Sequence, residues 1–92
     1  MQTETIKLDG NYLINNKHKN ARSAVYASGD FSTATANLEY RNSDGSYTSF
    51  IDGSIYSGDQ LQVDHGIGVE LYVTVSGSDA STHIEIKCAG VD

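Results

Sequence analysis

Apolar and polar residues alternate along two segments near the end of the chain, from Val69 to Ser76 and from Thr82 to Cys88. The apolar positions are Val69, Leu71, Val73 and Val75 in the first segment, and Ile84, Ile86 and Cys88 in the second. Successive side chains on a strand point to opposite sides of the sheet. A period of two therefore predicts two strands, each with one buried and one solvated face.

We expect these two strands to form a hairpin. A register that places both apolar sets on one face pairs Val75 with Ile84 and leaves Ser78–Ser81 as a four-residue loop, a common hairpin length. The outer pairs would then be Ser76 with His83, Thr74 with Glu85, and Tyr72 with Lys87.

The same alternation, broken by Gly, Asn and Asp clusters, continues upstream and indicates no helix. Strands are expected at Thr3–Leu8, Asn11–Asn15, Ala21–Ser28, Ser32–Arg41, Ser46–Asp52 and Leu61–His65. Short strands separated by frequent turn signals predict an all-β protein, a small antiparallel β-sandwich or barrel of about seven to eight short strands.

The sequence NSDG at Asn42–Gly45 is the strongest turn signal in the chain. A type I turn followed by a left-handed Gly45 gives a three-residue loop and pairs Tyr40 with Thr48 and Leu38 with Phe50. A two-residue Asp-Gly turn would pair Leu38 with Ile51 instead.

The length of 92 residues predicts a single domain over 1–92, with 1–20 as an N-terminal arm or anchoring segment. No apolar run reaches the ~20 residues of a membrane span. The N-terminus lacks a charged start followed by an apolar block, so we expect no signal peptide and synthesis in the cytoplasm.

Charge and residue usage narrow the range of partners. The net charge of −6 disfavours nucleic acid, because phosphate contacts need a basic surface. The single cysteine, Cys88, cannot form an internal disulfide and is expected in the core. Proline is absent, so the sheet edges need protection by charge, by loops or by a partner chain.

Candidate catalytic and metal-binding groups do not combine into a recognisable site. Asp79, His83 and Ser76 lie close in sequence, but on the expected hairpin they occupy a wet face without the shielding that a catalytic triad needs. The other two histidines, His18 and His65, are too far from His83 in sequence to indicate a zinc site. We expect no enzyme activity and no cofactor.

Two sets of residues are candidates for contacts with a partner. Lys17, Lys19 and Arg22 form the only basic cluster, which could meet an acidic surface or be a solvated loop. Tyr26, Tyr47 and Tyr72 fall on expected polar faces, and exposed tyrosines suit both protein contacts and stacking on sugars.

The run ATANLEYRNSDGSYTSFIDGSIYSGDQLQVDHGIGVELYVTVSGSDASTHIEI, from Ala34 to Ile86, resembles small β-sandwich structural proteins of tailed bacteriophages. This group includes capsid decoration (cement) proteins and head or tail fibre domains. The similar features are a strand ending in LEYRNSDGSYTSF, the middle segment SGDQLQV, a glycine corner, and the final VELYVTVSG with its small-residue hairpin. The likeness covers over half of the chain.

The resemblance implies a homotrimer in the virion that binds the major capsid protein or another virion protein and transfers no catalytic residue. We therefore expect a non-enzymatic capsid decoration protein that stabilises a phage head. The alternatives are a carbohydrate-binding module that uses the exposed tyrosines and a head or tail fibre adhesion domain.

Overall fold

A computed structural model describes residues 2–15 and 20–91 of the chain. The described residues form eight strands and no helix. The strands are β1 (Gln2–Ile6), β2 (Gly10–Leu13), β3 (Arg22–Asp30), β4 (Thr35–Arg41), β5 (Tyr47–Ile55), β6 (Gln60–Asp64), β7 (Leu71–Ser76) and β8 (His83–Val91). The all-β expectation is confirmed.

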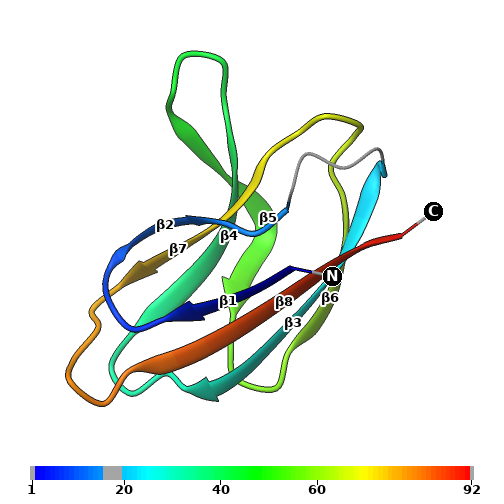
Figure 1. Cartoon of the computed structure of the whole chain (residues 1–92). Helices are drawn as coiled ribbons and strands as arrows, with labels where there is room; N and C mark the ends of the chain where they lie inside the picture. Colours follow the sequence, from blue (N-terminus) through cyan, green and yellow to red (C-terminus); the bar gives the residue numbers. More distant parts are fainter. Residues whose placement is uncertain (1, 16–19, 92) are drawn as a thin grey trace.

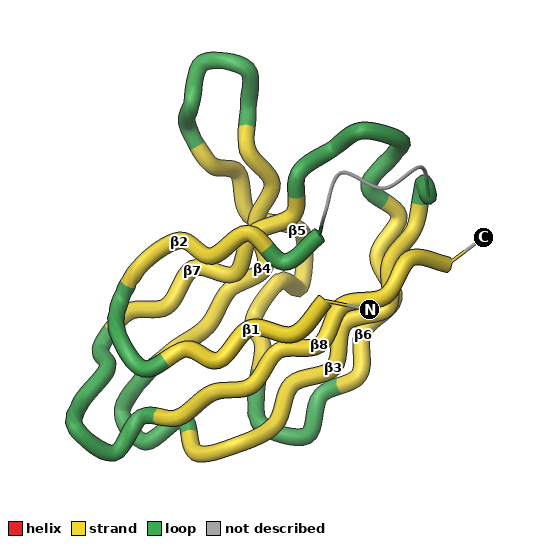
Figure 2. Tube along the Cα trace, in the orientation of Figure 1, coloured by secondary structure: helices red, strands yellow, loops and turns green. Residues whose placement is uncertain are grey.

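The strands divide into two antiparallel sheets of four, packed face to face (Figures 1 and 2). Sheet A has the order β1-β8-β3-β6 and sheet B the order β2-β7-β4-β5. Most connections cross from one sheet to the other, so strands adjacent in sequence seldom pair. This strand order is that of a jelly roll, a β-sandwich type found in viral capsid proteins and lectins among others.

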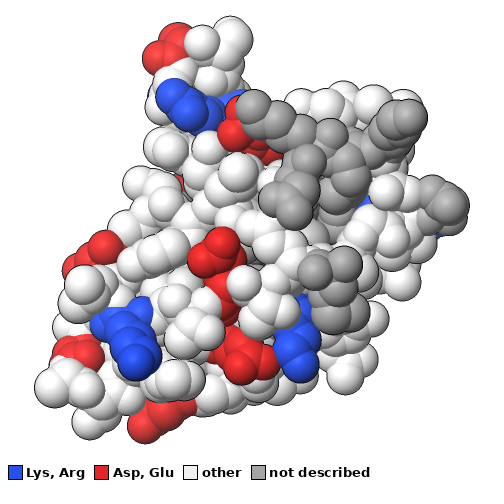
Figure 3. Space-filling model, viewed as in Figure 1, with Lys and Arg blue, Asp and Glu red and all other residues white. Residues whose placement is uncertain are grey.

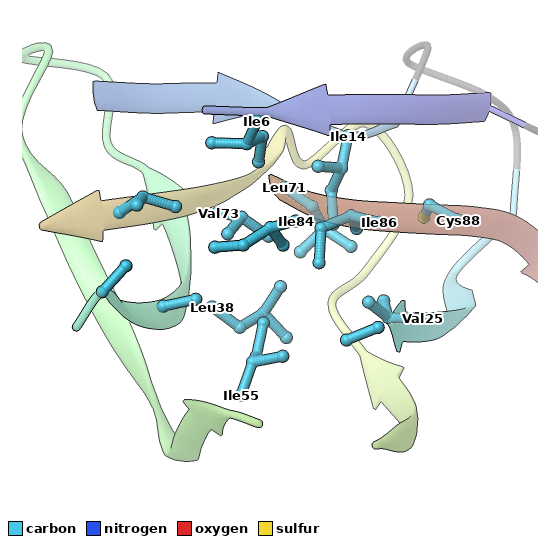
Figure 4. Close-up of a cluster of buried hydrophobic side chains, with 14 residues drawn as sticks. Ile6, Ile14, Val25, Leu38, Ile55, Leu71, Val73, Ile84, Ile86 and Cys88 are labelled. Carbon is cyan, nitrogen blue, oxygen red and sulfur yellow. The ribbon is translucent and has the colours of Figure 1, made fainter. Parts of the chain in front are cut away.

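The core lies between the sheets and consists of aliphatic side chains from both (Figure 4). The completely or almost completely buried members include Ile6, Val25, Leu38, Ile55, Leu71, Val73, Val75, Ile84 and Ile86. The alternation in the sequence therefore assigned the inward faces of β7 and β8 correctly. Cys88 is buried among them as a free thiol, as expected.

The expected hairpin of β7 and β8 is wrong. β7 pairs with β2 and β4 in sheet B, whereas β8 pairs with β1 and β3 in sheet A. The segment between Ser76 and His83 crosses from one sheet to the other, so Val73 and Ile86 belong to opposite layers of one core. Alternation fixes which face of a strand is buried but is the same for every partner strand.

The β4–β5 hairpin agrees with expectation at its turn and departs from it further along. Tyr40 pairs with Thr48, and the Gly45 N–H donates to the Asn42 carbonyl at 3.0 Å. Gly45 has a φ of 89°, the left-handed conformation that the three-residue loop requires. Leu38 does not pair with Phe50, because the register shifts between Asn37 and Glu39.

The shift is a large bulge in β5. Glu39 pairs with Ser49 and Asn37 pairs with Ser54, so four residues of β5, Phe50 to Gly53, stand opposite Leu38 alone. Bulges bend a strand and redirect its side chains. This one lies on the outermost strand of sheet B.

Candidate functional site

The expected basic cluster is only partly visible in the described structure. Lys17 and Lys19 lie outside the described residues. Arg22 begins β3, and its Nε lies 3.7 Å from Oδ1 of Asp64, with both side chains largely exposed. An exposed ion pair of this length contributes little to stability because water screens both charges.

The three candidate tyrosines do not form one surface. Tyr26 lies on β3 in sheet A and is well exposed, whereas Tyr47 and Tyr72 lie on β5 and β7 in sheet B. The rings of Tyr47 and Tyr72 meet edge to face with centroids 5.0 Å apart. Tyr72 is only 8% exposed, so the expectation of an exposed ring there is wrong. Its register places it on the outer face, and the Tyr47 ring packs against it there.

The phenol of Tyr72 lies between the carboxylate of Glu70 and the guanidinium of Arg41. Its hydroxyl donates to Oε2 of Glu70 at 2.8 Å. Burial first, and then this hydrogen bond to a carboxylate, raises the pKa of Tyr72 above its ordinary value. The phenol therefore stays protonated and acts as a fixed donor.

A ladder of polar side chains crosses the outer face of sheet B. Glu39 on β4 is its centre. Its Oε1 accepts from the Thr74 hydroxyl at 2.5 Å and its Oε2 from the Ser49 hydroxyl at 3.1 Å. The Asn11 amide donates to Thr74 Oγ1 at 2.6 Å, and the Asn37 amide donates to Ser49 Oγ at 2.6 Å. These residues come from all four strands of the sheet.

Asp79 ties two loops together. Its Oδ2 accepts from the Ser32 hydroxyl at 2.7 Å, and its Oδ1 accepts from the Ser81 backbone N–H at 2.9 Å. These bonds, the one from Ser32 foremost, lower the pKa of the Asp79 carboxyl. Asp79 lies on the solvent-exposed side, as expected, and its side chain joins the segment after β3 to the segment before β8.

A serine and a histidine distant in sequence form a hydrogen-bonded pair. Ser23 Oγ lies 2.8 Å from His65 Nε2, and His65 Nδ1 lies 2.7 Å from the carbonyl oxygen of Gly66. The second contact requires a proton on Nδ1, so the neutral ring accepts at Nε2 from the serine hydroxyl. Ser23 is 0% exposed, so a substrate cannot reach its hydroxyl. The pair is suited to satisfying a buried serine rather than to nucleophilic attack.

An apolar groove opens between the two outermost strands β5 and β6. It has a volume of about 500 Å³. Its apolar lining consists of Leu38, Tyr40, Phe50, Ile51, Leu61 and Val63. We call it the β5–β6 groove. Ile51, at the crest of the bulge, is 94% exposed, the most exposed large apolar side chain among the described residues.

Charge is spread thinly over the rest of the surface. In the view of Figure 3, acidic and basic side chains are scattered among uncharged ones, and the described Lys and Arg residues do not gather into one patch. No group of three or more His, Cys, Asp or Glu residues that could hold a metal is found within residues 2–15 and 20–91. Nor do those residues include a helix long and apolar enough to cross a membrane.

Comparison with known proteins gives no relative: no protein-family model, no curated protein and no solved structure matches this chain.

Sequence reasoning missed the groove, and a local signal for it exists. In YTSFIDGSI the polar–apolar alternation of β5 fails at Phe50-Ile51-Asp52-Gly53, where two large apolar residues are adjacent before a turn-like Asp-Gly pair. Such a failure inside a strand marks a bulge. The Ser23–His65 pair has no such signal, because 42 positions separate the two residues.

Proposed function

We propose that the chain is a non-enzymatic structural protein of a bacteriophage virion, a decoration protein that binds the major capsid protein and stabilises the head. The observation that carries the proposal is the β5–β6 groove with Ile51 beside it. The jelly-roll order is compatible with this role, but a fold hosts many functions, so the surface must carry the argument.

The groove suits a protein surface better than a small molecule. A small-molecule site encloses its ligand and orients it with a few convergent polar groups. The β5–β6 groove is open, and its carboxylates, Asp52 and Asp64, are exposed to solvent at its margin. Ile51 lines the groove but is 94% exposed, so a small ligand would leave most of this side chain in water, whereas a protein surface would cover both.

Particle binding tests the proposal. Virions and empty heads of the phage whose genome encodes the chain are separated on a density gradient, and the protein is detected with a specific antibody. We expect it to band with both particles and to raise the temperature at which empty heads open. Absence from both bands, together with no change in head stability, would refute the proposal. The homotrimer that the resemblance implies is part of the proposal and is tested by light scattering.

A carbohydrate-binding module is the second candidate, and the outer face of sheet B favours it. The ladder of amide, hydroxyl and carboxylate groups around Glu39 offers donors and acceptors of the kind that sugars use, and the partly exposed Tyr47 ring stands at one end of the same face. A monomer that is retained on a glycan column, and that Tyr47→Ala releases, would favour this candidate over a decoration protein.

A further inference from the structure

The bulge in β5 places an apolar side chain in water at a cost in backbone strain. Asp52 has a φ of 57°, the left-handed region that residues other than glycine rarely adopt. Within residues 2–15 and 20–91, Ser32 is the other non-glycine residue with positive φ, and it is held by two hydrogen bonds involving Asp30 and Asp79. The Asp52 side chain has no such bond among the described residues. Unrelieved strain of this kind is concentrated at binding and active sites.

At the end of the bulge, β5 lies very close to the backbone of β4 at Gly53. An added Cβ at Gly53 would lie 2.8 Å from the Leu38 carbonyl oxygen and 2.9 Å from the Phe50 carbonyl oxygen. The close approach of the two strands here requires glycine. A left-handed residue and an obligatory glycine thus follow Ile51 directly, in a bulge that places the Ile51 side chain in solvent.

Both strands that border the groove are sheet edges. β5 pairs only with β4, and β6 pairs only with β3, within the described part of the chain. An edge strand presents backbone N–H and C=O groups on its outer side, so another extended chain can add to it. Alternate side chains of an added strand would point toward the core, where Leu61 and Val63 are only half buried.

The negative charge at the margin of the β5–β6 groove favours a partner segment that carries positive charge. Asp52 and Asp64 flank the groove, and Arg22 lies 3.7 Å from Asp64 in an exposed contact that water screens. A second copy that docked groove to groove would place its own Asp52 and Asp64 against the same carboxylates of the first copy and be repelled, so we expect the contacts of the proposed homotrimer on another surface. A segment that carries Lys or Arg beside its apolar residues would be attracted.

We propose that the β5–β6 groove is a docking site for an extended segment of another protein. This segment adds a strand to the edge of sheet A at β6. Apolar side chains two residues apart fill the groove against Phe50 and Leu61, and lysine or arginine side chains between them face Asp52 and Asp64. Ile51 is the anchor that the bulge presents to the partner. This inference rests on the proposed function, for which it names the contact surface.

The test uses the isolated full-length chain, labelled with ¹⁵N, and a short capped peptide of alternating valine and lysine. A peptide of alternating valine and glutamate is the control. We expect saturable NMR shifts confined to residues 49–53 and β6 with the lysine peptide at concentrations up to about 1 mM, and none with the glutamate peptide. Raising the salt concentration to about 0.5 M should weaken binding because it screens the charge contacts.

Two uncharged variants separate the anchor from general effects. Ile51→Ser should weaken binding by about tenfold or more, since it removes the apolar anchor without adding a carboxylate that would attract the lysine peptide. Leu8→Ser changes a side chain that is also exposed, at 70%, in the turn between β1 and β2, and should leave binding unchanged.

Several results would overturn the inference. They are equal binding of the two peptides, shifts centred outside the groove, equal effects of the two variants, or groove shifts that grow with protein concentration when no peptide is present. The last result would assign the groove to a second copy. The peptide experiment contains no virus particle, so its failure is separate from a failure of the density-gradient experiment.

Discussion

Replacing Asn15 by Ala tests how the end of sheet B is held together. Asn15 is 2% exposed. Its side chain makes the hydrogen bonds that the backbone of a neighbouring strand would make with the segment leading into β7. Its Nδ2 donates to the Val69 carbonyl oxygen at 2.9 Å, and its Oδ1 accepts from the Leu71 N–H at 3.0 Å. Alanine would remove both bonds.

The expected loss of stability depends on whether water can hydrogen-bond to each backbone group that loses its Asn15 partner. Leu71 is 0% exposed, so water cannot easily replace the lost acceptor, and an unsatisfied buried N–H costs about 1–3 kcal/mol. Val69 is only half buried, so its carbonyl can bind water and adds about 0.5 kcal/mol. We expect Asn15→Ala to lower the free energy of unfolding by about 1.5–3.5 kcal/mol.

Urea unfolding, followed by tyrosine fluorescence, measures this change. Asn11→Ala is the matched control, because Asn11 makes its hydrogen bond to Thr74 on the exposed outer face of the same sheet. The control should lose less than about 0.5 kcal/mol, as is usual for surface changes. Equal losses in the two variants, or no loss for Asn15→Ala, would show that the side chain does not bridge Val69 and Leu71.

Three further predictions concern the core, the bulge and the loss of stability at low pH. Val73→Ala should cost roughly 2–4 kcal/mol in urea unfolding through lost burial and a cavity, while Ser76→Ala on the same strand should cost little. Gly53→Ala should cost on the order of 1–3 kcal/mol, since its Cβ would press on the Leu38 carbonyl; a neutral result would mean that the strands are further apart than described. Folding lowers the pKa of Asp79, so its contribution is present above the unfolded-state value of about 4 and is lost as the pH falls through the lower folded value. Asp79→Asn should therefore flatten the loss of stability below about pH 4 in thermal melts, and an unchanged loss would contradict the loop contacts.

The sequence predicts the faces of the strands better than their neighbours. The inward positions of Val73 and Ile84 follow from local alternation, which every pairing must respect. The choice of partner strand depends on contacts between distant segments, and alternation cannot distinguish a hairpin from a crossing between sheets. The β7–β8 hairpin was wrong for this reason, whereas the Gly45 turn was right because its chemistry is local.

In the candidate site, too, features set by the local sequence could be predicted, whereas features that depend on distant segments could not. The exposed position of Tyr26 follows from its own strand, but the burial of Tyr72 depends on the ring of Tyr47, which reaches it from another strand. The β5–β6 groove is formed by the outermost strands of two sheets. Only the break in alternation around Ile51 marks it in the sequence.

The central claim is that the β5–β6 groove faces the capsid when the protein is bound. Hydrogen exchange, measured by mass spectrometry on the free protein and on protein bound to empty heads, tests it most directly. We expect slower exchange on the particle at residues 50–53 and along β6, with little change at β1 and on the outer face of sheet B. Protection centred on that outer face or on β1, with β5 and β6 exchanging as in the free protein, would contradict it.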